Sequence, residues 1–152
     1  MAAFALARRL RAGETVYSGW CTLGSPIVAE SVARGGFVAV ALDAQHGLWD
    51  AASVPAGIAA VHHTGATPIV RVPLNDFGFV SRALDLGAEA IIAPMINSAA
   101  DARVFASVAK YPPLGERSWG PTRAMSLQDM SIATGYLREA NAGTLTQAMI
   151  DT

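Results

Sequence analysis

The 152-residue chain has a single cysteine, Cys21, which excludes an internal disulfide framework and favours a reducing, cytoplasmic location. Charged residues make up only 15% of the chain, and the net charge of -1 gives no electrostatic reason to expect nucleic acid as a partner. No apolar run reaches the roughly 18 residues of a membrane helix. The arginine-rich stretch at 8–11 lacks the apolar segment and cleavage site that would make it a signal peptide. We therefore expect neither a nucleic acid nor a membrane as partner.

Apolar residues are abundant instead. They make up 52% of the sequence, and the mean hydropathy is +0.34, which indicates heavy burial or an exposed face that binds a partner. The length suffices for one domain with a core, and no linker or shift in composition divides the chain. We therefore expect residues 1–152 to form a single domain.

Three apolar runs end abruptly in polar residues. They are FVAVALDAQH at 37–46, PIVRVP at 68–73 and AIIAPMIN at 90–97. Such runs are typical of strands buried on both faces of a parallel sheet. In α/β folds the carboxyl ends of these strands line the ligand site. The sequence therefore predicts an enzyme site at this edge of the sheet.

Strand and helix patterns alternate along the whole chain. Strands are expected at 16–22, 37–42, 67–72, 89–94 and 145–150. Helices are expected at 3–11, 25–34, 50–64, 75–86, 98–110 and about 128–141, with a long Pro/Gly loop at 111–123. This β-α-β-α order predicts parallel strands joined by helical crossovers.

Two α/β architectures fit this order. A doubly wound sheet is one, but CTLGSP at 21–26 lacks the glycine-rich phosphate-binding fingerprint GxGxxG after the first strand. We therefore favour a TIM-type (β/α)8 barrel, truncated after about five βα units.

Four side chains at these strand ends and nearby are candidates for chemistry. His46 is placed to act as a base at neutral pH, although a loop histidine held by a hydrogen bond has the same pattern. Arg71 closes an apolar strand and needs an anion, either a structural carboxylate such as Asp43 or a substrate carboxylate or enolate. Taken by itself, Asp85 has the pattern of a solvated helix residue, and Trp20 has that of a core residue.

Several longer motifs, taken together, resemble the HpcH/HpaI aldolases, which are metal-dependent pyruvate aldolases with a TIM-type barrel. They are GW at 19–20, LDAQHG at 42–47, PIVRVPLND at 68–76, LDLGAEAIIAPMINS at 84–98 and YPPLGERSWGPTRA at 111–124. The resemblance runs in order from about residue 16 to residue 151. It implies that the chain corresponds to the N-terminal portion of such an enzyme.

The resemblance also assigns roles to individual residues. His46 matches the catalytic histidine, which acts through a metal-bound water, and Asp85 matches the aspartate that pairs with it. Arg71 matches the arginine that holds the pyruvate oxygen and stabilises the enolate. Trp20 is taken as a second substrate-binding residue. Because Asp85 precedes its next strand, we expect it to reach a neighbouring subunit of a homo-oligomer, which is a hexamer in full-length family members.

The implied cofactor is a divalent cation, Mg²⁺ or Mn²⁺, with Co²⁺ or Zn²⁺ as alternatives. It would act as a Lewis acid on the carboxylate and keto oxygen of pyruvate. Asp151 stands where the family has its first ligand, a glutamate, and its arm is one methylene shorter. The second ligand would lie beyond Thr152, so we expect the 152-residue chain alone to be inactive or nearly so.

The reaction implied by the resemblance is carbon–carbon lyase chemistry. The expected substrate is a 2-keto-4-hydroxy acid, such as 4-hydroxy-2-oxoheptanedioate or a 2-keto-3-deoxy sugar acid, which is cleaved reversibly to pyruvate and an aldehyde. Two alternatives stay open. One is a lyase of the citrate-lyase β or malyl-CoA type, and the other is a non-catalytic fragment that serves as a subunit.

Overall fold

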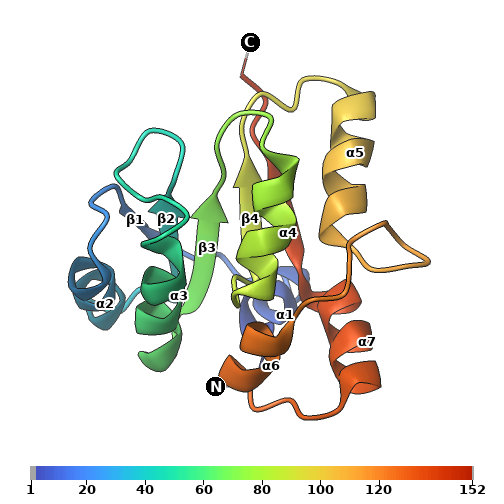
Figure 1. The fold of residues 1–152 in the computed structure, drawn as a ribbon. Helices are drawn as coiled ribbons and strands as arrows, with labels where there is room; N and C mark the ends of the chain where they lie inside the picture. The colour runs from blue at the N-terminus through green and yellow to red at the C-terminus, as the bar shows by residue number, and fades with distance from the viewer. Residues whose placement is uncertain (1–2, 152) are drawn as a thin grey trace.

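A five-stranded parallel sheet forms the centre of the computed structural model, which describes residues 3–151 (Figure 1). The strands are β1 (Ser18–Cys21), β2 (Ala39–Asp43), β3 (Thr67–Arg71), β4 (Ala90–Ala93) and β5 (Leu145–Ala148). The helices are α1 (Ala5–Arg11), α2 (Pro26–Arg34), α3 (Val54–His63), α4 (Phe77–Asp85), α5 (Ala99–Ala109), α6 (Thr122–Leu127) and α7 (Ala133–Gly143). None of the helices within residues 3–151 has the length and apolar character needed to span a lipid bilayer.

The strands lie side by side in the order of the sequence, and every neighbouring pair is parallel. A doubly wound sheet reverses its strand order near the middle. Within residues 3–151 there is no such reversal, so the doubly wound alternative was wrong. The predicted α/β class and the five parallel strands are confirmed.

The helix expected at about 128–141 is present as α7 but begins later, at Ala133. The short helix α6, which ends at Leu127, was not predicted. Asp129 adopts a left-handed backbone conformation, with φ of +52°, which no continuous right-handed helix accommodates. This residue therefore separates the two helices.

The sheet carries apolar side chains on both faces. Helices α2 to α5 pack along one face, as Figure 1 shows, over a core that includes Val40, Leu42 and Val70. The other face carries the alternate residues Ala39, Ala41, Ile69, Ala90 and Ile92, with Leu6 of α1 packed against them. Because side chains alternate along a strand, Asp43 and Arg71 fall on the same face as Ala41 and Ile69. The fold thus places both charged side chains on the face of the sheet that α1 covers, the inner face.

Glu89 is buried at the amino-terminal edge of the sheet, immediately before β4. Its Oε1 accepts a hydrogen bond from Gln128 Nε2 at 3.3 Å. Glu89 Oε2 and Gln128 Oε1 are both buried without a hydrogen-bond partner in the described part of the chain. Burial raises the pKa of Glu89 above its ordinary value. A raised pKa means that the protonated form stabilises the fold below about pH 4, and that this contribution is lost as the pH rises through the folded-state pKa.

Glu89→Gln is therefore expected to stabilise the protein at pH 7.5 by about 1 kcal/mol, because a neutral amide avoids burying a charge. The difference from wild type should shrink toward zero near pH 4, where Glu89 itself is neutral. Urea unfolding across pH 4–8 measures this effect. Glu14→Gln, at a surface carboxylate paired with Arg9, is the control, and its effect on the free energy of unfolding should depend little on pH. A gain that is equal at all pH values would exclude charge burial as its cause.

Candidate active site

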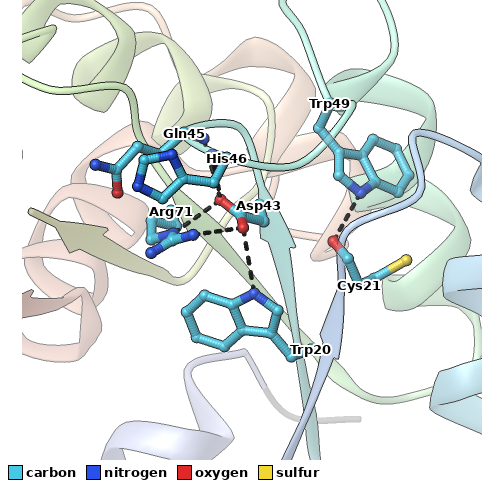
Figure 2. A network of polar contacts seen from close by, with 7 residues as sticks. All are labelled: Trp20, Cys21, Asp43, Gln45, His46, Trp49 and Arg71. Carbon is cyan, nitrogen blue, oxygen red and sulfur yellow. Dashed lines mark hydrogen bonds and ion pairs between the residues drawn. The ribbon is translucent and has the colours of Figure 1, made fainter.

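Asp43, at the carboxyl end of β2, is the centre of a hydrogen-bond network (Figure 2). Its Oδ1 accepts hydrogen bonds from Arg71 Nε at 2.8 Å and from the backbone N–H groups of Gln45 at 3.1 Å and His46 at 3.2 Å. Its Oδ2 accepts from Arg71 Nη2 at 2.5 Å and from Trp20 Nε1 at 3.3 Å. Residues from β1, β2, β3 and the loop after β2 thus meet at one carboxylate.

The sheet register brings Asp43 and Arg71 together. The two residues are direct partners in the β2–β3 pairing, and both fall on the inner face. The backbone continues the pairing one step further, because Ala44 N–H donates to the carbonyl oxygen of Arg71 at 2.9 Å. The bidentate ion pair therefore follows from strand pairing rather than from a flexible loop.

Asp43 is ionised in this environment. Its side chain is only 1% exposed, and burial alone would raise its pKa. The hydrogen bonds from Arg71, from the His46 and Gln45 backbone and from Trp20 outweigh burial and hold the pKa of Asp43 well below its usual range. With both oxygens engaged, this carboxylate is an organising group and is poorly placed to act as a base or a metal ligand.

Arg71 keeps part of its hydrogen-bonding capacity. Its side chain is 11% exposed, and its Nε and Nη2 bind Asp43. Among residues 3–151 no acceptor engages Nη1. The guanidinium carbon lies 5.0 Å from the centre of the Trp20 ring, a cation–π contact. A ligand oxygen can therefore be bound by an arginine whose orientation is already fixed on two sides.

The loop that carries His46 is held close to the sheet. Trp49 Nε1 donates to the carbonyl oxygen of Cys21 at 3.0 Å, which ties the end of the loop to β1. At Gly47 a side chain is excluded, since a Cβ atom there would lie 2.3 Å from the Asp43 carbonyl oxygen. His46 itself is exposed. The loop thus holds the backbone of His46 in place and leaves its imidazole accessible.

The structure brings three of the predicted site residues together, namely Trp20, His46 and Arg71. The anion that Arg71 meets is the structural carboxylate of Asp43, one of the two alternatives left open by the sequence. Trp20 is 46% exposed, so the interpretation of this residue as core was wrong. Asp43 was not among the predicted site residues, although its place at a strand end beside Arg71 was the available signal.

Asp85 lies at the end of α4, away from this cluster and toward the amino-terminal edge of the sheet (Figure 1). Its Oδ1 accepts a hydrogen bond from Arg117 Nη2 at 2.6 Å. The Arg117 side chain is 1% exposed, and its guanidinium carbon lies 4.4 Å from the centre of the Tyr111 ring. Within the described chain no hydrogen bond joins Asp85 to His46. Pairing with a histidine of another subunit therefore stays a prediction.

Asp151, the predicted metal ligand, follows β5. Its Oδ2 accepts from the backbone N–H of Met95 at 3.2 Å, and its backbone exchanges two hydrogen bonds with the Asn97 amide. Residues 3–151 contain no group of three His, Cys, Asp or Glu side chains that could hold a metal ion. With Asp43 engaged by five donors, these residues by themselves do not fit a complete divalent-cation site.

The family model described as HpcH/HpaI aldolase/citrate lyase matches residues 17–151. The chain belongs to this family. A hydroxypyruvate/pyruvate aldolase from Rhizorhabdus wittichii is 38% identical over 92% of this chain and 54% of the relative. This HpcH/HpaI chain therefore spans about half the length of the curated relatives it matches.

Solved structures agree with this membership. An HpcH/HpaI aldolase/citrate lyase family protein from Burkholderia cenocepacia superposes with a TM-score of 0.84 and is 31% identical, over 96% of this chain and 59% of the other. The citrate synthase SbnG gives a TM-score of 0.84 at 26% identity, over 97% of this chain and 56% of that protein. The resemblance inferred from the sequence motifs is confirmed.

Proposed function

We propose that this chain provides the pyruvate-binding part of a carbon–carbon lyase site. The protein would cleave a 2-keto-4-hydroxy acid reversibly to pyruvate and an aldehyde, with 4-hydroxy-2-oxoheptanedioate or a 2-keto-3-deoxy sugar acid as candidate substrates. The observation that carries the proposal is the oriented Arg71 guanidinium, with donors uncommitted beside an exposed His46. Family membership and the relative named as a pyruvate aldolase support this reaction class.

Arg71 supplies the electrostatic part of the mechanism. Cleavage of the C3–C4 bond leaves the electron pair on C3 of the pyruvate portion, and resonance carries the negative charge onto the keto oxygen. An arginine already fixed by Asp43 and by the Trp20 ring stabilises that oxygen without reorganising during the reaction. Trp20 also offers a half-exposed ring beside the bound pyruvate.

His46 supplies the proton transfer. During cleavage its imidazole accepts the proton of the 4-hydroxyl group as the aldehyde forms, and that proton then passes to C3 of the enolate to give pyruvate. In the addition direction a proton leaves C3 of pyruvate to form the enolate, and His46 gives a proton to the new alkoxide. The side chain is exposed while its backbone is anchored to Asp43. The general base is therefore held by its backbone while its imidazole stays accessible to the substrate.

The divalent cation of the family, Mg²⁺ or Mn²⁺ with Co²⁺ or Zn²⁺ as alternatives, is not part of this mechanism. In the described chain only Asp151 is proposed as a ligand, and one carboxylate does not make a site. The proposed roles of Arg71 and Trp20 are supported by their contacts with Asp43 and with each other, and that of His46 by its exposed position beside them and by family membership.

The wider architecture is also part of the proposal. Five parallel strands in sequential order fit one incomplete (β/α)8 barrel domain, in a cytoplasmic homo-oligomer where Asp85 reaches the site of a neighbouring subunit. The citrate-lyase β or malyl-CoA type of lyase is the second candidate, favoured by the superposition on a citrate synthase. Turnover with an acyl-CoA, and none with an aldehyde, would select the second candidate.

Binding of oxalate, a mimic of the pyruvate enolate, tests the proposed site. The protein is labelled with 5-fluorotryptophan, which gives three ¹⁹F resonances because the chain has three tryptophans. Oxalate and pyruvate should shift the resonance of Trp20, and Arg71→Met should weaken the affinity for both ligands by about 10- to 100-fold, the loss expected for a charge-assisted hydrogen bond. Arg34→Met, at an exposed pair on α2, is the matched control. If neither ligand moves the Trp20 resonance, the proposed function is wrong.

A further inference from the structure

Gln45 carries a hydrogen-bond acceptor that no group within residues 3–151 uses. Its backbone N–H donates to Asp43 Oδ1, which fixes the residue at the site. Its side-chain Oε1 is buried and has no hydrogen-bond partner in the described part of the chain. Gln45 directly precedes His46 in the loop after β2, and Figure 2 shows it in the network around Asp43. An orphaned oxygen therefore stands among the residues that would bind the keto acid.

A buried amide oxygen without a donor is costly, and native structures keep such a group where something else supplies the donor. The neighbouring Nε and Nη2 of Arg71 are directed to Asp43, as are the backbone N–H groups of Gln45 and His46. Pyruvate has a carboxylate, a keto oxygen and a methyl group, and therefore no donor. In the proposed site Nη1 of Arg71 is the donor to the keto acid, so a hydroxyl group of the ligand would supply the donor that Gln45 Oε1 lacks.

We propose that Gln45 is a specificity residue whose Oε1 accepts a hydrogen bond from a hydroxyl group on the carbon chain of a 2-keto acid. This inference rests on the proposed function and deepens it, because it names the chemical group that distinguishes a preferred ligand from plain pyruvate. The hydroxyl group can come from C3 of the donor, as in hydroxypyruvate. It can also come from C4 of the aldol, as in 4-hydroxy-2-oxobutanoate.

Gln45→Met tests this role, since methionine keeps the length of the side chain and removes the acceptor. Dissociation constants for pyruvate, hydroxypyruvate and 4-hydroxy-2-oxobutanoate are measured through the Trp20 ¹⁹F resonance. The variant should bind at least one hydroxylated acid about tenfold more weakly and pyruvate within twofold of wild type. A loss confined to hydroxypyruvate assigns the C3 hydroxyl, and a loss confined to 4-hydroxy-2-oxobutanoate assigns the C4 hydroxyl.

Gln128→Met is the matched control, because Gln128 Oε1 is also buried without a partner but lies at the opposite edge of the sheet. It should leave all three affinities unchanged. If Gln45→Met weakens all three acids equally, or none of them, Gln45 has no role in specificity, although the proposed function survives. If wild-type protein does not bind pyruvate, the proposed function fails and this inference fails with it.

Discussion

Asp43→Ala is expected to lower the free energy of unfolding by about 3–5 kcal/mol, the range for a buried ion pair that loses one partner. The substitution leaves the largely buried guanidinium of Arg71 without its counter-charge. It also removes the acceptor for the Trp20 indole and for two backbone N–H groups of the loop after β2. Urea unfolding at pH 7 with a constant m-value is the appropriate measurement.

The control is Glu14→Ala, which breaks the exposed ion pair with Arg9 and should cost less than about 1 kcal/mol. The double variant Asp43→Ala/Arg71→Met should recover part of the loss, because no unpaired charge remains buried. Equal losses for Asp43→Ala and Glu14→Ala would refute the central role of Asp43.

The pKa of Asp43 also predicts how the free energy of unfolding changes at acidic pH. Because its folded-state pKa is lowered, Asp43 contributes stability above the unfolded-state value of about 4, and this contribution is lost as the pH falls through the folded-state pKa. Below pH 4 the stability difference between wild type and Asp43→Ala should therefore narrow.

Asp85→Ala is expected to destabilise the fold by a similar amount, about 3–5 kcal/mol. Arg117 is among the most deeply buried charged side chains described here, and Asp85 is its counter-charge. Without Asp85 the guanidinium stays beneath the Tyr111 ring with no carboxylate to neutralise it. Thermal and urea unfolding of the variant measure the loss.

The stability of Asp85→Ala distinguishes a structural role of Asp85, which is to hold Arg117, from a purely catalytic role. If Asp85 acts only on a histidine of another subunit, Asp85→Ala should unfold at the wild-type midpoint. If Asp85 anchors Arg117, the double variant Asp85→Ala/Arg117→Met should be more stable than Asp85→Ala alone. A stable Asp85→Ala protein would contradict the anchoring role.

Strand positions and strand ends were predictable because buried parallel strands have long apolar runs that stop at polar residues. The sequence named Asp43 as one possible partner of Arg71, but it could not choose between Asp43 and a substrate anion, because the pairing of residues 43 and 71 depends on the register between strands. The Asp85–Arg117 pair joins a helix end to a distant loop, and no local pattern reports such a contact. The break at Asp129 was missed because aspartate only occasionally adopts the left-handed conformation.

The sequential strand order has a consequence for how the chain folds during synthesis. Each strand pairs with the strand made just before it, and Trp20, Asp43, Gln45, His46 and Arg71 all belong to the first three strands and their connections. Contacts between neighbouring units form early because little loop entropy opposes them. Strand β5, by contrast, pairs with β4 across the long segment between Ala93 and Leu145. The Asp43 network can thus assemble on the emerging chain while the second half of the sheet is still being translated.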